Sequence, residues 1–118
     1  MCGIFAIFSS SLSNADLRRE LIRCSSKLRH RGPDWSGYVV VDKSDSIPLS
    51  HGIAHERLAI MDPESGEQPL VSEDGNVIVA ANGEIYNFQD LYGDLKTPYT
   101  PKTGSDCEVI LPLYAQEG

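Results

Sequence analysis

The sequence predicts an α+β fold, because its strand-like and helix-like segments occur in blocks rather than in a regular alternation. An apolar strand and an amphipathic helix come first, several strands and a hairpin follow, and two helices close the chain. With 118 residues, of which 41% are hydrophobic and 23% charged, the chain is expected to form one globular domain.

The chain is expected to begin with a buried strand at residues 2–8, since that stretch is apolar and rich in β-branched and aromatic residues. Asn14 should then cap a helix whose apolar residues recur at helical spacing. This stripe consists of Leu17, Leu21, Cys24 and Leu28. Cys24 is therefore expected to be a small core residue, as buried free cysteines usually are.

The middle of the chain predicts sheet structure. Residues 30–34 contain a Gly-Pro pair and should end the helix, because the residue before a proline avoids helical backbone angles. Apolar residues that alternate or are β-branched predict strands at 37–41 and 49–54. An Asp-Gly pair predicts a two-residue hairpin turn within residues 71–81.

Two helices are expected near the end of the chain. The first should span residues 87–95, and a loop that contains two prolines should cover residues 96–104. Ser105 and Glu108 have the spacing of a capping box, which predicts the start of the second helix. Pro112 does not suit the interior of that helix and should kink it.

Composition argues against several classes of function. The net charge of -7 disfavours a surface for nucleic acid or anionic membranes. No apolar run approaches the length of a membrane span, and the first residues lack the basic region of a signal peptide. The three widely spaced cysteines, Cys2, Cys24 and Cys107, fit neither a disulfide framework nor a zinc motif, which favours a reducing compartment.

Metal and nucleotide sites are not expected in this chain. His51 and His55 have the spacing of a helical zinc pair, but they lie in a strand-like segment with no evident third ligand. The glycine-rich loops that cradle nucleotide phosphates are absent from the sequence. No cofactor is therefore predicted.

Cys2 is the first candidate for chemistry. Removal of Met1 would leave a thiol and a free α-amine on one residue, and the amine could take the proton from the thiol. Such a residue is a nucleophile that carries its own base. By position alone, a buried cysteine at the start of a core strand is an equally weighted alternative.

Other residues could complete a site that acts on the amide of an amino acid. The Asn82 side chain and the Gly83 N–H are suitable donors for an oxyanion, although Asn-Gly is also a common turn. Arg57 follows a predicted strand and could bind a carboxylate in bidentate fashion. Asp106 could bind an ammonium group or, equally, complement a helix dipole.

Six segments carry a resemblance to a known family: MCGIF at 1–5, RHRGPDWSG at 29–37, HERLAIMD at 55–62, QPL at 68–70, NGEIYN at 82–87 and TGSDCEVILPLY at 103–114. Together they resemble the glutaminase half of the glutamine-hydrolysing asparagine synthetases, which are class II amidotransferases with an N-terminal nucleophile. The resemblance implies the front part of a four-layer αββα sandwich. It also implies that residues 1–118 are an amidotransferase domain incomplete at its C-terminus, without the synthetase domain.

The resemblance implies a role for each matching residue. Cys2 would be the nucleophile, with its α-amine as base after removal of Met1, and Asn82 and Gly83 would form the oxyanion hole. Arg57 would hold the α-carboxylate of glutamine. The α-ammonium group would be received by Glu84 and Asp106. One wall of the glutamine pocket would consist of Arg57, Leu58, Ala59, Ile60 and Met61.

The resemblance also implies partners. Glutamine would be hydrolysed to glutamate and ammonia through a thioester, and the ammonia would pass to a C-terminal domain. There ATP and magnesium would activate aspartate for conversion to asparagine. A homodimer and a cytosolic location are the accompanying expectations. Two alternatives stay open: a non-catalytic fragment or binding module, and a different class II amidotransferase.

Overall fold

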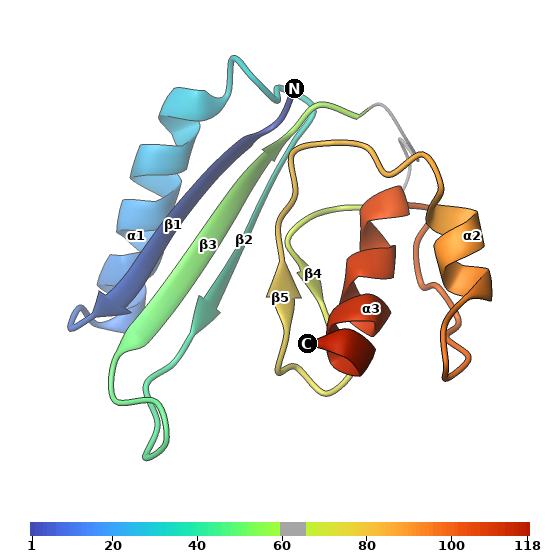
Figure 1. Ribbon diagram of the computed structural model, residues 1–118. Coiled ribbons are helices and arrows are strands. Elements are labelled where there is room, and N and C mark those ends of the chain that lie inside the picture. Colours follow the sequence, from blue (N-terminus) through green and yellow to red (C-terminus); the bar gives the residue numbers. More distant parts are fainter. Residues whose placement is uncertain (60–65) are drawn as a thin grey trace.

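The structure is a computed structural model that describes residues 1–59 and 66–118. These residues form one three-stranded and one two-stranded antiparallel sheet together with helices, as Figure 1 shows. The predicted α+β class is therefore confirmed. Among the described residues, no helix has the length and apolar character needed to cross a membrane.

The larger sheet has the strand order β1-β3-β2, with β1 at Gly3–Ser10, β2 at Trp35–Val41 and β3 at Ser50–Arg57. Helix α1 (Asn14–Ser25) covers one face of this sheet, and the remaining elements lie on the other side (Figure 1). The register pairs the start of β1 and the start of β2 with the end of β3. Residues that follow β3 are thereby brought next to the N-terminus.

The core between α1 and the sheet consists of Leu17, Leu21 and Ala54, all almost fully buried. The helix is capped by Ser13 rather than by the predicted Asn14, because the Ser13 hydroxyl accepts a hydrogen bond from the Asp16 N–H. The helix prediction was therefore displaced by one residue at its start.

Cys24 departs from the predicted core stripe. It is only half-buried, and its sulfur lies beside the side chains of Glu20 and Arg23 on the outer part of α1. The prediction that it is a core residue was wrong. A stripe drawn at ideal helical spacing is wider than the surface that the sheet covers here, and Cys24 falls at its edge.

The strand predictions need two corrections. Strand β1 starts at Gly3 and is not buried throughout, since Phe8 is 71% exposed. Strand β3 continues beyond the predicted end at residue 54, through three residues that are polar yet buried: His55, Glu56 and Arg57. An alternating apolar pattern does not detect such residues, because their burial depends on partners elsewhere in the chain.

The smaller sheet is a short hairpin of β4 (Leu70–Val71) and β5 (Ile78–Val79), shorter than the predicted strands. The predicted turn does contain Asp74 and Gly75, and Gly75 has a positive φ of 73°. The connection is longer than a two-residue turn, because the backbone bonds from Ser72 enclose a wider loop.

The last two helices are α2 (Phe88–Gly93) and α3 (Ile110–Glu117), and a 3-10 turn at Asp106–Val109 precedes α3. The predicted capping box is wrong, because Ser105 makes no side-chain cap bond and Glu108 binds the preceding loop instead. Pro112 lies in the first turn of α3, which directly continues the 3-10 turn. The expected kink stays a prediction.

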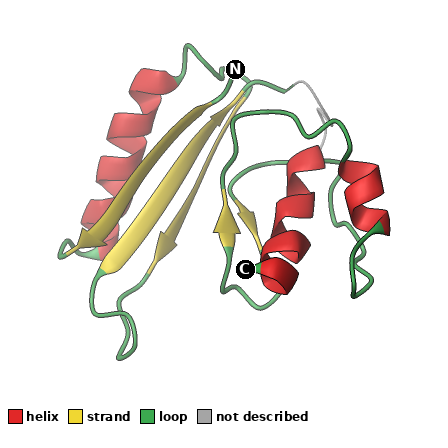
Figure 2. Ribbon diagram, in the orientation of Figure 1, coloured by secondary structure: helices red, strands yellow, loops and turns green. Residues whose placement is uncertain are grey.

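The chain between the sheets comes into close contact with β2 at one point. A Cβ atom at Gly37 would lie 2.1 Å from the carbonyl oxygen of Gln68, so only glycine allows this approach. The contact fixes the segment that leads into β4 against the larger sheet. Loop structure then dominates from the end of β5 to α2, as Figure 2 shows.

Candidate active site

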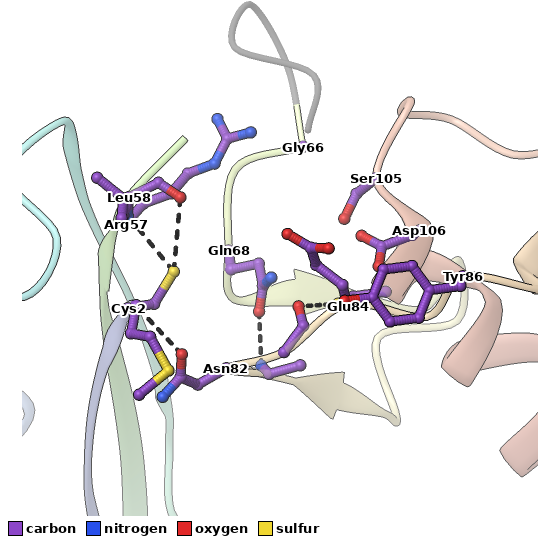
Figure 3. Close-up of a pocket in the computed structure, with 14 residues that line it drawn as sticks. Cys2, Arg57, Leu58, Gly66, Gln68, Asn82, Glu84, Tyr86, Ser105 and Asp106 are labelled. Carbon is purple, nitrogen blue, oxygen red and sulfur yellow. Dashed lines mark hydrogen bonds between the residues drawn. The ribbon is translucent and has the colours of Figure 1, made fainter. Parts of the chain in front are cut away.

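A cavity of about 270 Å³ lies at the end of the large sheet where β1 starts and β3 ends. The loop after β5 and the 3-10 turn before α3 face this end of the sheet. Fourteen residues line it (Figure 3). Seven of the residues that the sequence nominates for the site are among them: Cys2, Arg57, Leu58, Asn82, Gly83, Glu84 and Asp106. The fold thus gathers most of the predicted site around one cavity.

Cys2 lies just before β1, and its backbone and thiol are both held. Its nitrogen donates a hydrogen bond to Asn82 Oδ1 at 3.0 Å, and its carbonyl accepts one from Arg31 Nε at 3.0 Å. The sulfur lies 3.4 Å from the Leu58 nitrogen and 3.7 Å from the Leu58 oxygen. The thiol is thus held against the backbone of Leu58.

Met1 also lines the cavity and is 70% exposed. While Met1 is present, the Cys2 nitrogen belongs to a peptide bond and has no basic lone pair. Removal of Met1 would turn the same nitrogen into an α-amine that lies within hydrogen-bond distance of Asn82.

Asn82 and Gly83 follow β5 in the loop that faces Cys2. Because Asn82 Oδ1 already accepts from the Cys2 nitrogen, the Nδ2 group is the donor that the carboxamide has left. A Cβ atom at Gly83 would meet no other part of the chain within 4 Å. Glycine is therefore not required by packing here, and its absence of a side chain leaves space beside the cavity.

Arg57 is the last residue of β3 and is 6% exposed. Figure 3 shows its side chain on the same side of the cavity as Cys2 and Leu58, opposite Glu84 and Asp106. A cation and two carboxylates therefore border the same cavity from different sides. This distribution suits a zwitterionic amino-acid head group.

The remaining residues of the predicted wall divide into two cases. Ala59 does not line the cavity, and its N–H donates to Asp34 Oδ2 at 2.8 Å. Ile60 and Met61 lie outside the described residues. The wall on this side is thus formed by Arg57 and Leu58 as far as the described residues go.

The two carboxylates differ in burial. Glu84 is exposed, whereas Asp106 is 5% exposed and accepts a hydrogen bond from the Ile85 N–H. That bond ties the segment after Gly83 to the 3-10 turn before α3. Asp106 therefore has a structural partner in addition to its place on the cavity, which a helix-dipole role alone would not explain.

Sequence reasoning missed several lining residues, chiefly Gly66, Gln68, Tyr86, Ser105 and Cys107. Each lies in or next to a segment that carries the family resemblance, which was the available signal. Their individual positions on the cavity depend on how distant segments meet.

Cys107 is the second thiol on the cavity, and it differs from Cys2 in burial. It is 2% exposed, and its burial together with the Asp106 carboxylate raises the pKa of the thiol to about 11. At neutral pH it is therefore protonated and a poor nucleophile. Its S–H points to the Gly83 carbonyl, with the sulfur 3.8 Å from that oxygen.

The histidines have other contacts. The Ser9 N–H donates to His51 Nδ1, and His55 Nε2 lies 3.1 Å from the Ala81 carbonyl oxygen. Within the part of the chain that the structure describes, no group of three or more His, Cys, Asp or Glu residues is placed to hold a metal ion.

Comparison with known proteins gives a consistent picture. A family model described as a glutamine amidotransferase domain matches residues 1–118. The chain is 48% identical over 120 residues to a probable asparagine synthetase (glutamine-hydrolyzing) of Dictyostelium discoideum, covering 100% of this chain and 20% of that protein. It is 46% identical over 118 residues to asparagine synthetase (glutamine-hydrolyzing) 1 of Arabidopsis thaliana, covering 100% and 19%.

A bacterial relative matches over the same range. Asparagine synthetase B (glutamine-hydrolyzing) of Escherichia coli (strain K12) is 43% identical over 118 residues, with 100% of this chain and 20% of that protein covered. The chain spans about a fifth of the length of the curated relatives it matches. Because the family model covers the whole sequence, the chain belongs to the glutamine amidotransferase domain family.

Proposed function

We propose that this chain hydrolyses glutamine to glutamate and ammonia, with Cys2 as the nucleophile. The observation that carries the proposal is the placement of the Cys2 sulfur on a cavity bordered by Asn82, Arg57 and two carboxylates (Figure 3). A nucleophile, oxyanion donors and anchors for a zwitterion are what hydrolysis of an amino-acid amide needs.

The first step forms the tetrahedral intermediate that precedes the thioester. After loss of Met1, the α-amine of Cys2 takes the thiol proton, and the sulfur attacks the carboxamide carbon of glutamine. The carbonyl oxygen becomes an oxyanion. The Nδ2 group of Asn82 and the N–H of Gly83 are proposed to donate to it, and removal of one such donor in other enzymes costs about 100- to 1000-fold in rate.

The second step releases ammonia. As the tetrahedral intermediate collapses, the C–N bond breaks and the leaving nitrogen takes the proton from the α-ammonium group of Cys2. A γ-glutamyl thioester remains. Water then attacks the thioester with the α-amine as base, the C–S bond breaks, and glutamate and the free thiol are formed.

The substrate is proposed to be held by its head group. Arg57 would bind the α-carboxylate, and Glu84 with Asp106 would bind the α-ammonium group. Leu58 would contact the aliphatic part of the substrate, together with Ile60 and Met61 from the same segment. The opposite charges on the two sides of the cavity support this orientation.

The wider role is proposed from the relatives, which are named asparagine synthetases. Residues 1–118 would be the front part of a four-layer αββα amidotransferase domain. The ammonia would serve a C-terminal synthetase domain that uses ATP and magnesium to convert aspartate to asparagine. A homodimer in the cytosol would complete this picture, and a reducing compartment would keep the Cys2 thiol free.

The test is covalent capture by the reactive glutamine analogue 6-diazo-5-oxo-L-norleucine. Intact mass should show loss of Met1 and one adduct, and peptide mapping should assign that adduct to Cys2. Cys107→Ser is the matched control, because it removes the other cavity thiol and should still be labelled. No adduct on a processed chain would overturn the proposal, and glutamine binding without an adduct would indicate a binding module instead.

A further inference from the structure

The backbone of residues 81–83 is held by three buried side chains that come from three different parts of the chain. The His55 Nε2 group donates to the Ala81 carbonyl at 3.1 Å, and Gln68 Oε1 accepts from the Ala81 N–H at 2.6 Å. The Cys107 thiol donates to the Gly83 carbonyl. We refer to His55, Gln68 and Cys107 as the backbone clamp.

The backbone clamp binds peptide groups that lie beyond the end of strand β5. Strand β5 ends at Val79, so residues 81–83 lie beyond the ladder that would otherwise hold their peptide groups. Side chains take over this role here, and they bind the backbone on both sides of Asn82. The clamp residues are 0%, 8% and 2% exposed, so water competes little for these bonds.

The chemistry of His55 is fixed by its partner. A carbonyl oxygen only accepts, so Nε2 carries the proton and the neutral ring has a bare lone pair on Nδ1. That Nδ1 atom is buried and has no hydrogen-bond partner among the residues that the structure describes. Burial also lowers the pKa of His55, so the ring is neutral at neutral pH. The Nε2–H group of the neutral ring thus binds the Ala81 carbonyl.

The geometry points to a positioning function: we propose that the backbone clamp fixes Asn82 and Gly83 relative to Cys2 for oxyanion binding. This inference rests on the proposed glutamine hydrolysis. The Ala81 C=O belongs to the peptide group that precedes Asn82, and the His55 bond restrains it. The Ala81 N–H belongs to the peptide group before that one, and the Gln68 bond restrains it as well. The Asn82 side chain in turn contacts the Cys2 nitrogen.

The same strand connects two parts of the site. His55 and Arg57 lie two residues apart on β3 and therefore on one face of the sheet. One strand thus sets the positions of both the proposed carboxylate anchor and His55 of the clamp. A displacement of about 1 Å at such a site can cost about 100-fold in rate, so a positioning residue there has a measurable effect.

The test compares His55→Leu with His55→Gln in the protein that carries residues 1–118. Leucine removes the donor, whereas the glutamine amide can place an N–H near the original Nε2 position. We expect His55→Leu to lower kcat by about 10- to 100-fold, with KM changed by less than about threefold. Hydrogen exchange at 81–83, followed at the Ala81 amide that donates to Gln68, should become at least tenfold faster. His55→Gln should restore most of both quantities.

Leu21→Val is the matched control, because it weakens the core on the opposite face of β3. It should leave exchange at 81–83 and kcat unchanged. If His55→Leu does not fold, Cys107→Ala, with Cys107→Ser as its rescue, tests the other end of the clamp. Equal effects in the core control, unchanged exchange at 81–83, or a rise in KM alone would overturn the inference. If the wild-type protein shows no turnover, the proposed function fails, while the exchange rates still decide the clamp.

Discussion

At the scale of single residues, Cys2 and Asn82 are 80 positions apart in the sequence, yet the Cys2 nitrogen lies 3.0 Å from Asn82 Oδ1. The chemical character of that nitrogen depends on whether Met1 is attached. As an amide it is a donor only, and as an α-amine it is also a base near neutral pH. The reactivity of the site should therefore depend on N-terminal processing.

A first prediction follows for chains that keep Met1. A short N-terminal extension that blocks methionine removal should lower the rate of Cys2 alkylation by 6-diazo-5-oxo-L-norleucine by at least about 100-fold, because the built-in base is lost. Intact mass against time measures this rate. The control is the same chain after proteolytic removal of the extension up to Cys2. Equal rates for the two forms would show that the α-amine is not the base.

Gly83 offers a second test. A methyl group there meets no chain atom within 4 Å, so Gly83→Ala should change the free energy of unfolding by less than about 0.5 kcal/mol. The methyl group would nevertheless occupy space next to the proposed oxyanion donor, and turnover should fall at least about tenfold. Gly93→Ala is the matched control, since its added Cβ also meets nothing within 4 Å but lies outside the cavity. Turnover that survives Gly83→Ala would place the oxyanion elsewhere.

Glu108 is a buried carboxylate that organises the loop before it. Its two oxygens accept from the N–H groups of Lys102 and Thr103, from the Thr103 hydroxyl and from the Tyr99 hydroxyl, at 2.6 to 2.8 Å. Burial by itself raises the pKa of Glu108, but the donors outweigh burial and the pKa is lowered. The carboxylate therefore stabilises the folded state only while it is ionised.

The third prediction is the pH dependence that results. Because the folded pKa is below the unfolded value of 4.5, the stabilisation is fully present above pH 4.5 and is lost as the pH falls through the folded pKa. Glu108→Gln should lower the free energy of unfolding at pH 7 by about 1–3 kcal/mol and remove this acid-sensitive part. Denaturant unfolding between pH 3 and 7 measures both. Parallel pH curves for the two proteins would contradict the assignment.

At the scale of elements, α1 is held to the large sheet by a small apolar core. Leu17 and Leu21 are fully buried against Ala54, and a Cβ atom at Gly52 would lie only 2.4 Å from Leu21 Cδ1. The leucine thus fills the space that a glycine leaves on β3. A helix packed this closely is sensitive to loss of volume.

The fourth prediction concerns that contact. Leu21→Ala should cost about 2–5 kcal/mol of unfolding free energy, from lost burial and the cavity left behind. Ile22→Ala is the control on the same helix, since Ile22 is 45% exposed and should cost less than about 1 kcal/mol. Denaturant titration followed by circular dichroism gives both values. Similar losses at the two positions would mean that α1 is not packed as described.

At the scale of the whole molecule, the large sheet has two edges. Among the described residues, β1 and β2 each pair with β3 alone. Apolar side chains near these edges are accessible, notably Phe8, Trp35 and Tyr38. Unpaired strand edges beside apolar surface promote association.

The fifth prediction is that the isolated 118 residues are unstable or self-associate. Sedimentation velocity over a range of concentrations should show species larger than a monomer, or the chain should melt without a cooperative transition. Phe8→Lys is the matched change, since a charge at this exposed edge position should reduce association. A monomeric and cooperatively melting wild-type chain would refute this prediction.

Much of the fold could be predicted from local pattern. The helix around Leu17 and Leu21, the strands at 37–41 and 49–54 and the turn at Asp74-Gly75 depend on periodicity and turn chemistry, which neighbouring residues determine. The structural predictions that were wrong share one physical cause. The end of β3, the partners of Glu108 and the exposure of Cys24 depend on contacts with distant segments.

The candidate site divides in the same way. The sequence by itself determined which functional groups are available, and it nominated Cys2, Arg57, Asn82, Gly83 and Asp106 as candidates for a site that acts on the amide of an amino acid. Only the tertiary structure decided that they share a cavity, and that His55, Gln68 and Cys107 hold the backbone behind it. These relations are distances between segments far apart in sequence, and packing alone sets such distances.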